Sequence, residues 1–67
     1  MEFTKRFNEV LKQCGKTQTQ IAKELSITKQ CVNDYKSGKS VPSVETLYSL
    51  CKCLDVSADY LLGLTDF

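Results

Sequence analysis

The sequence predicts an all-α fold, a compact bundle of five helices in a single domain over residues 1–67. Apolar residues recur at spacings of three and four, and no segment shows the sustained period-two alternation of a strand. Serine, threonine and glycine residues that favour helix caps divide this pattern into five segments. A chain of 67 residues has a marginal core, so we expect every apolar stripe to be buried.

The first helix is predicted at residues 2–14, where Phe3, Phe7 and Val10 recur at helical spacing. Gly15 follows it, at a position where glycine readily adopts a left-handed cap. The second helix begins at Thr17, whose spacing to Gln20 predicts a capping box.

A short turn at Ser26 and Ile27 is predicted to join the second helix to a third. Thr28 caps this third helix, and Gly38 ends it. The predicted inward residues of the two helices are Ile21, Ala22, Leu25, Val32 and Tyr35.

The last two helices follow the longest connection, residues 39–43. Ser43 caps one of them, with Glu45 in a first turn where the helix dipole favours an acid, and Ser57 caps the other. The predicted inner stripe after Ser43 consists of Val44, Leu47, Cys51 and Leu54, widened by Leu50. The apolar residues predicted for the last helix are Tyr60, Leu61, Leu62 and Leu64, with Gly63 as its breaker.

Charge is divided unevenly, although the net charge is only +1. Residues 1–40 hold eight Lys/Arg and four acids, whereas residues 41–67 hold one lysine and four acids. A basic half that contains a polar helix is typical of nucleic-acid binding, although small proteins also divide charge unevenly by chance.

The composition argues against catalysis, cofactors and metal binding. The chain has no histidine to act as a general base and no Cys-x-x-C pair, so we expect neither a catalytic residue nor a metal site. No apolar run approaches the ~20 residues of a membrane span, and no signal peptide is evident, so we expect a cytoplasmic protein without a membrane partner. A chain of 67 residues has no room for a separate ligand domain, so we expect no small-molecule ligand. We expect the cysteines to be small core residues, with a redox switch at Cys31 as the weaker alternative. They are Cys14, Cys31, Cys51 and Cys53.

The predicted third helix has a polar outer face opposite Val32. Amide side chains pair with adenine, a lysine pairs with guanine, and an aspartate accepts from the amino group of cytosine. Any solvated helix face is also polar, so this face alone leaves both interpretations open. The candidate base-reading residues are Lys29, Gln30, Asn33 and Asp34.

Two possible phosphate anchors flank this helix. The backbone N–H groups at Thr17–Thr19 and the positive end of the helix dipole suit a phosphate, and Lys39 and Ser40 follow the third helix. Phosphate contacts position a protein on DNA, and base contacts select the sequence.

Together these segments resemble the Cro/C1-type helix-turn-helix domains, the lambda repressor-like or xenobiotic-response-element family. The resemblance covers nearly the whole chain and implies a five-helix fold in which helices 2 and 3 form the helix-turn-helix and helix 3 enters the major groove. The matching segments are QTQIAKEL (18–25), IT (27–28), GK (38–39), VPS (41–43), ETL (45–47) and LxVSxDYLLG (54–63, where x marks a position outside the match).

The resemblance also suggests roles for residues and marks departures from the family pattern. It assigns base reading to Lys29, Gln30 and Asp34, with Asn33 as a further candidate. Ser26 replaces the usual turn glycine, and we expect a left-handed backbone there. The candidate phosphate-binding residues are Thr17, Gln18, Lys36, Ser37, Lys39, Ser40 and Ser43.

A second departure concerns an ion pair of the family. Lys36-Ser37 stands where Glu-Asn is common, and Leu11 stands where the arginine partner is often found. We therefore expect a hydrophobic or solvated arrangement in its place, which leaves Lys36 free to face a phosphate.

The resulting hypothesis is a sequence-specific transcriptional regulator, a repressor that binds a palindromic operator in double-stranded DNA as a homodimer. The alternative is a protein-interaction module, an antitoxin or adaptor, with the same fold. The candidate dimer-interface residues are Tyr60, Leu64 and Phe67, although such residues could also simply close the bundle.

Overall fold

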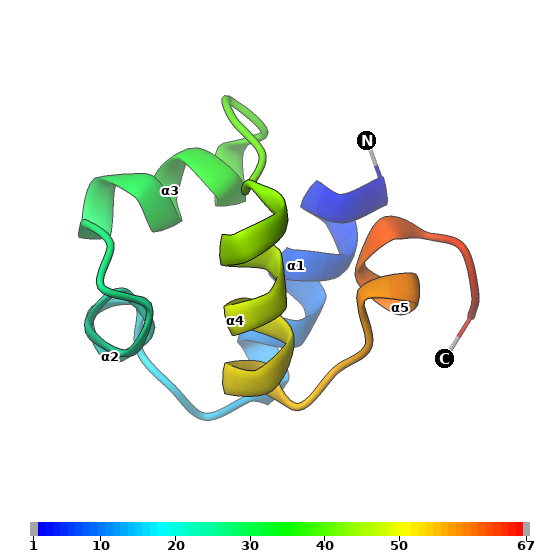
Figure 1. Cartoon of the computed structure of the whole chain (residues 1–67), viewed down its shortest axis with the longest axis horizontal. Coiled ribbons are helices and arrows are strands. Elements are labelled where there is room, and N and C mark those ends of the chain that lie inside the picture. Colours follow the sequence, from blue (N-terminus) through cyan, green and yellow to red (C-terminus); the bar gives the residue numbers. More distant parts are fainter. Residues whose placement is uncertain (1, 67) are drawn as a thin grey trace.

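The computed structural model describes residues 2–66, which contain five α-helices and no β-strand (Figure 1). The predicted five-helix, all-α fold is confirmed. In chain order the helices are α1 (Glu2–Gln13), α2 (Gln18–Leu25), α3 (Lys29–Ser37), α4 (Val44–Leu54) and α5 (Ala58–Leu62).

Each of the helices α1 and α4 packs against two of the other three helices. The α2 and α3 helices pack on each other, α1 contacts both α3 and α5, and α4 contacts both α2 and α5. Figure 1 shows α4 in the middle of the view, with α2 and α3 on one side and α5 on the other. The α2–α3 unit therefore rests on a framework made by the rest of the bundle.

An aromatic cluster fixes α3 on α1. The rings of Phe3 and Phe7 stack with their centres 5.3 Å apart. The ring of Tyr35, from α3, meets both of them edge-on, at 6.4 and 6.2 Å. These rings are almost fully buried, so they fix the rotation of α3 about its axis and thereby choose its outward face.

Four helices begin with the predicted hydroxyl caps. In each, the side-chain oxygen accepts a hydrogen bond from the backbone N–H three residues later, at 3.1–3.3 Å. The capping residues are Thr17, Thr28, Ser43 and Ser57.

The predicted inner stripe of α4 is wrong at Val44, which is 85% exposed. Leu50, predicted only to widen the stripe, is fully buried and lies at its centre, with Leu54 also buried. At roughly 100° per residue, Val44 lies well away from the direction shared by Leu50 and Leu54. It also belongs to the first turn of α4.

Gly63 ends α5 as predicted, whereas Leu64 and the cysteines differ from expectation. The helix ends at Leu62, Gly63 adopts φ 81°, and Leu64 beyond it is 73% exposed. All four cysteines are free and only half-buried, at the edge of the core rather than inside it.

A hydrophobic contact and one hydrogen bond replace the ion pair that the family resemblance suggests between α1 and the end of α3. Leu11 packs against the core, as the hydrophobic alternative predicted. The Nδ2 amide of Asn8 donates to the backbone carbonyl of Lys36 at 2.9 Å. The side chain of Lys36 is therefore not needed to hold α3 in place.

Candidate nucleic-acid interface

The turn between α2 and α3 is tight and left-handed. Ser26 adopts φ 56° and ψ 39°, which confirms the conformation predicted for this position. The N–H of Ile27 donates to the carbonyl of Ala22 at 3.0 Å, which closes the end of α2. Ala22 is only 6% exposed, and its small side chain allows α2 and α3 to approach closely.

The outward face of α3 is polar and accessible. Val32 is fully buried, and Tyr35 is 7% exposed, so the opposite side of α3 faces solvent. Of the four candidate base-reading residues, three are exposed and the fourth is half-buried. The exposed residues are Lys29, Gln30 and Asn33, and the half-buried one is Asp34.

Two side-chain hydrogen bonds organise this face. The Nε2 amide of Gln18, at the start of α2, donates to Oδ1 of Asn33 at 2.6 Å. The Nε2 amide of Gln30 donates to Oδ1 of Asp34 at 3.0 Å. The first bond joins a candidate phosphate-binding residue to a candidate base-reading residue, and the second joins two base-reading candidates.

The start of α2 keeps free backbone donors. The first N–H groups of a helix have no partner inside it. The capping box uses the N–H groups of Thr17 and Gln20, at 2.9 and 3.1 Å. The N–H groups of Gln18 and Thr19 remain for an anion, whereas the hydroxyl of Thr17 already serves as the cap.

Beside this helix start lies a basic hollow of about 400 Å³ between α1, α2 and α3. It brings together three phosphate candidates, Thr17, Gln18 and Lys36. Lys12, which sequence reasoning missed, lies beside them. Asn8 and Lys12 lie four residues apart on α1, a signal for a shared polar stripe, but the sequence does not indicate that this stripe faces α2. The lining residues are Asn8, Leu11, Lys12, Lys16, Thr17, Gln18 and Lys36.

Lys16, the third lysine of the hollow, is already paired. Its Nζ contacts Oε1 of Glu24 at 3.1 Å and the carbonyl of Cys53 at 3.0 Å. The hydrogen bond between Lys16 and Glu24 lowers the pKa of Glu24 and raises the pKa of Lys16. Burial, followed by the hydrogen bond to Glu24, raises the pKa of the Cys53 thiol. The cluster ties α2 to α4, which leaves Lys12 and Lys36 as the lysines of the hollow outside any ion pair of residues 2–66.

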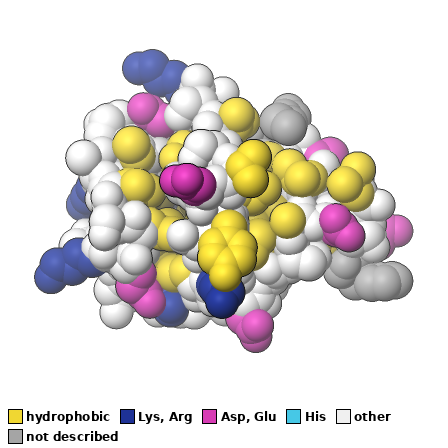
Figure 2. Space-filling view, in the orientation of Figure 1, with side chains coloured by type: hydrophobic (Ala, Val, Ile, Leu, Met, Phe, Trp, Pro, Cys, Tyr) yellow, Lys and Arg dark blue, Asp and Glu magenta, His cyan; other side chains and the backbone are white. Residues whose placement is uncertain are grey.

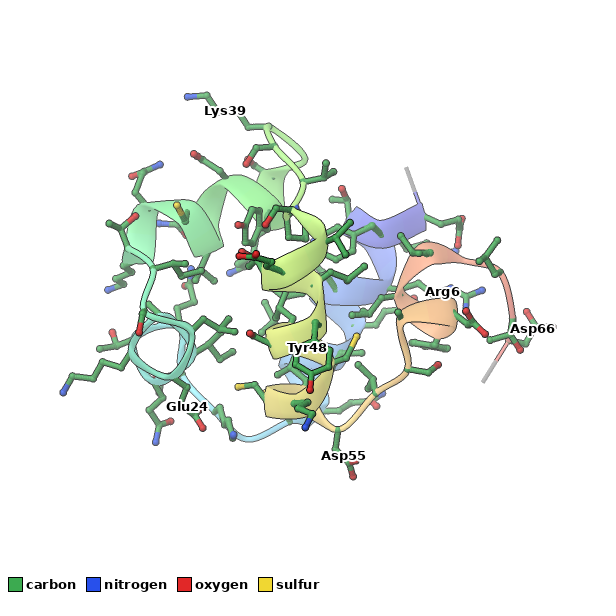
Figure 3. The ribbon with its side chains drawn as sticks, in the orientation of Figure 1. Arg6, Glu24, Lys39, Tyr48, Asp55 and Asp66 are labelled. Atoms are coloured by element: carbon green, nitrogen blue, oxygen red, sulfur yellow. The ribbon has the colours of Figure 1, made fainter. Side chains whose placement is uncertain are left out.

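The loop after α3 presents Lys39 to solvent. The N–H groups of Lys39 and Ser40 both donate to the carbonyl of Asp34, at 3.0 and 3.3 Å. This backbone arrangement follows Gly38, which adopts φ 83°. Figure 3 shows the Lys39 side chain extending away from the body of the molecule, at the end of α3.

Two phosphate candidates use their hydroxyl groups within the protein. Ser37 donates its Oγ to the carbonyl of Asp34 at 3.2 Å. Ser43 caps α4 and also donates to Oγ1 of Thr46 at 3.1 Å. Both residues are exposed, but their hydroxyls contribute first to local structure.

The candidate dimer residues have different surroundings. Tyr60 is half-buried, and its hydroxyl donates to Glu9 at 3.5 Å. Leu64 is exposed and contributes little to the core. Phe67 lies outside the described residues.

Within residues 2–66, no group of three or more His, Cys, Asp or Glu side chains is placed to hold a metal ion. None of the helices in that range is both long and apolar enough to cross a membrane.

Comparison with known proteins places this geometry in a family. The helix-turn-helix family model matches residues 8–61. The uncharacterised HTH-type transcriptional regulator YqaE of Bacillus subtilis is 42% identical over 84% of this chain and 52% of its own length. The cryptic phage CTXphi transcriptional repressor RstR of Vibrio cholerae is 33% identical over 94% of this chain and 56% of its own.

A third relative is described as an activator, whereas RstR is described as a repressor. The HTH-type transcriptional activator BcrR of Enterococcus faecalis is 31% identical over 94% of this chain and 31% of its own length. The chain thus spans about half the length of YqaE and RstR, and less of BcrR. No solved structure matches it significantly. The match over residues 8–61 shows that the chain belongs to the Cro/C1-type helix-turn-helix family of DNA-binding transcriptional regulators.

Proposed function

We propose that this chain binds double-stranded DNA with sequence specificity and regulates transcription, with α3 lying in the major groove. The observation that carries the proposal is the exposure of Gln30 and Asn33 on the side of α3 opposite its buried anchors. Two groups of candidate phosphate-binding residues support the proposal, one in the hollow near Lys12 and one at Lys39. This arrangement suits a helix that meets base edges while its flanks contact the backbone.

Repression is the favoured outcome of binding. Occupying an operator is enough to block polymerase, whereas activation needs a further contact with it. RstR is described as a repressor and BcrR as an activator, so similarity alone supports a role in regulation. The preference for repression rests on the simpler requirement for blocking polymerase. A regulator with this DNA target would act in the cytoplasm. DNA binding alone would account for its effect, without any catalytic step.

We further propose that two copies bind a palindromic operator. One recognition helix reads only a few base pairs, so affinity and selectivity improve when a two-fold dimer places two helices one turn of DNA apart. Leu64 supports this assignment because it is apolar and 73% exposed beside α5. Sedimentation should give a 2:1 complex on a palindromic site, and a strict monomer on that site would contradict the dimer.

Mobility-shift titration at two salt concentrations tests DNA binding. Gln30→Ala should cost ~1–3 kcal/mol on the selected operator and little on random DNA, since a base contact is lost. Lys39→Ala should weaken binding to both DNAs equally and reduce the salt dependence. Equal losses on both DNAs for Gln30→Ala would refute its reading role.

The exposed apolar surface of α4 and of the segment before it favours a second candidate, a protein-interaction module. Val41, Val44 and Tyr48 are 53%, 85% and 62% exposed. Figure 2 shows hydrophobic side chains gathered across the middle of this face, over α4. An antitoxin or adaptor that acts only through this surface would show no steep loss of DNA affinity with salt, because it would displace no counterions from DNA.

A further inference from the structure

The side chains of Gln30 and Asp34 are joined one helical turn apart on the outward face of α3, through the 3.0 Å bond from Nε2 to Oδ1. We infer that this pair acts as a single reading unit for an adenine whose neighbour on the same strand is a base with an exocyclic amino group in the major groove, adenine or cytosine. The inference rests on the proposed DNA binding and specifies the base chemistry of the operator.

The hydrogen bond determines which groups remain available to DNA. An amide nitrogen carries two N–H donors, so Gln30 keeps one N–H and its carbonyl oxygen Oε1. The carboxylate of Asp34 accepts through both oxygens, so Oδ2 remains a free acceptor. The pair therefore presents one donor and two acceptors, with the amide held against rotation by its bond to the carboxylate.

Adenine matches the Gln30 half of the unit. Its major-groove edge offers the N7 acceptor beside the N6 amino donor, which meet the free N–H and Oε1 of the amide. The carboxylate of Asp34 lies beside that amide and needs a donor of its own. In the major groove only the amino groups of cytosine and adenine supply one, so the neighbouring base on the same strand is predicted to be cytosine or adenine.

Asp34 also acts against the other bases. Guanine and thymine present acceptors at that edge, and a desolvated carboxylate facing an acceptor is unfavourable. No ion pair of residues 2–66 includes Asp34, so no cation in that range neutralises the carboxylate directly. The residue therefore contributes specificity by penalising guanine and thymine more than by adding affinity.

Selection of bound sequences from a random DNA library tests the inference with the whole chain and two variants. The wild-type motif should contain an adenine whose neighbour on the same strand is restricted to adenine or cytosine. A swap to guanine at that position should weaken binding roughly five- to 150-fold in the wild type. In Asp34→Asn, whose amide can also donate, the neighbouring position should admit guanine or thymine while the adenine is retained.

Asp55→Asn is the matched control. It removes the same charge from the C-cap of α4, where Asp55 has φ 55°, a conformation that asparagine tolerates. Figure 3 shows Asp55 at the end of the molecule opposite Lys39, so the selected motif should not change.

Each outcome of the selection is informative. A wild-type motif without the adenine and its restricted neighbour overturns the inference, and so does an Asp34→Asn motif identical to that of the wild type. Either result leaves the proposed DNA binding intact. A chain that enriches no sequence and shows no salt-dependent shift on DNA refutes the proposed function itself.

Discussion

The guanidinium of Arg6 lies over the ring of Tyr60, with its central carbon 4.5 Å from the ring centre. The same group donates to the backbone carbonyls of Tyr60 and Thr65, and its Nη2 is 3.6 Å from the carboxylate of Asp66 (Figure 3). One α1 side chain therefore holds α5 and the segment after it. Tyr60 is committed to this contact, which leaves Leu64 as the more accessible of the described dimer candidates.

Removing the Arg6 guanidinium should destabilise the fold. Arg6→Ala leaves two carbonyl groups without their charged donor, and we expect the free energy of unfolding to fall by about 1–3 kcal/mol. Urea denaturation followed by far-UV circular dichroism measures this change. Lys5→Ala, at an exposed neighbouring position, should change stability by less than about 0.5 kcal/mol. Similar effects of the two substitutions would show that the Arg6 contacts are unimportant for stability.

Glycine at position 26 should relieve the backbone strain of the left-handed conformation that Ser26 adopts. A non-glycine residue in this conformation costs about 1–2 kcal/mol. Glycine removes this cost, but it also makes the unfolded chain more flexible, which offsets part of the stabilisation. Ser26→Gly should therefore raise the free energy of unfolding by about 0.5–1 kcal/mol. Ser26→Ala keeps the Cβ atom and should give no increase. A stabilisation by alanine equal to that by glycine would rule out backbone strain as the cause.

The Glu24 carboxylate should make stability depend on acid. Because Lys16 and then Cys53 hydrogen-bond to it, its pKa in the folded state is lowered from the ordinary value of 4.5. The unfolded chain then binds the proton more tightly, so the contribution is complete above pH 4.5 and is lost as pH falls through the lower folded pKa.

Comparing the wild type with Glu24→Gln over this acid range measures the contribution. The variant should be less stable near neutral pH and should approach the wild type in acid. In a Lys16→Met background the same substitution should have a smaller effect, because the principal partner is already gone. An undiminished effect in that background would assign the pH dependence to other groups.

The basic hollow should contribute to the salt dependence of DNA binding. If Lys12 contacts a phosphate, Lys12→Ala should reduce the slope of log affinity against log salt by about 0.9, equally on operator and random DNA. Lys36→Ala should act in the same way. Lys52→Ala is the control, because that lysine lies near the Tyr48 ring of α4 and outside the hollow. An unchanged slope for Lys12→Ala would exclude it from the phosphate contacts.

Local features of the fold were predictable because their causes are local. The hydroxyl of Thr28 needs only the N–H of Cys31, three residues later, to begin a helix. The buried positions of Val32 and Tyr35 follow from helical spacing in a chain too short to leave apolar stripes unused. The outward position of Gln30 follows from theirs, since both lie on one rigid helix.

Other features depend on which elements meet, and spacing within one helix carries no such information. Val44 is in helical register with Leu47 and Cys51, yet it is exposed because the packing of α4 on α2 and α5 turns the side of Leu50 and Leu54 inward. Lys12 has no local feature that sets it apart from other surface lysines, and only the approach of α1 to the start of α2 brings it beside Gln18. The bond between Gln18 and Asn33 likewise needs the relative placement of two helices.

The sequence alone therefore determined the helices, their caps, the left-handed turn and the polar face of α3, because each depends on interactions between residues a few positions apart. Tertiary structure alone decided the rotation of α4, the residues that line the basic hollow and the contact of the Arg6 guanidinium with the Tyr60 ring. These features arise where helices distant in sequence pack together, and the packing of the whole core sets that geometry.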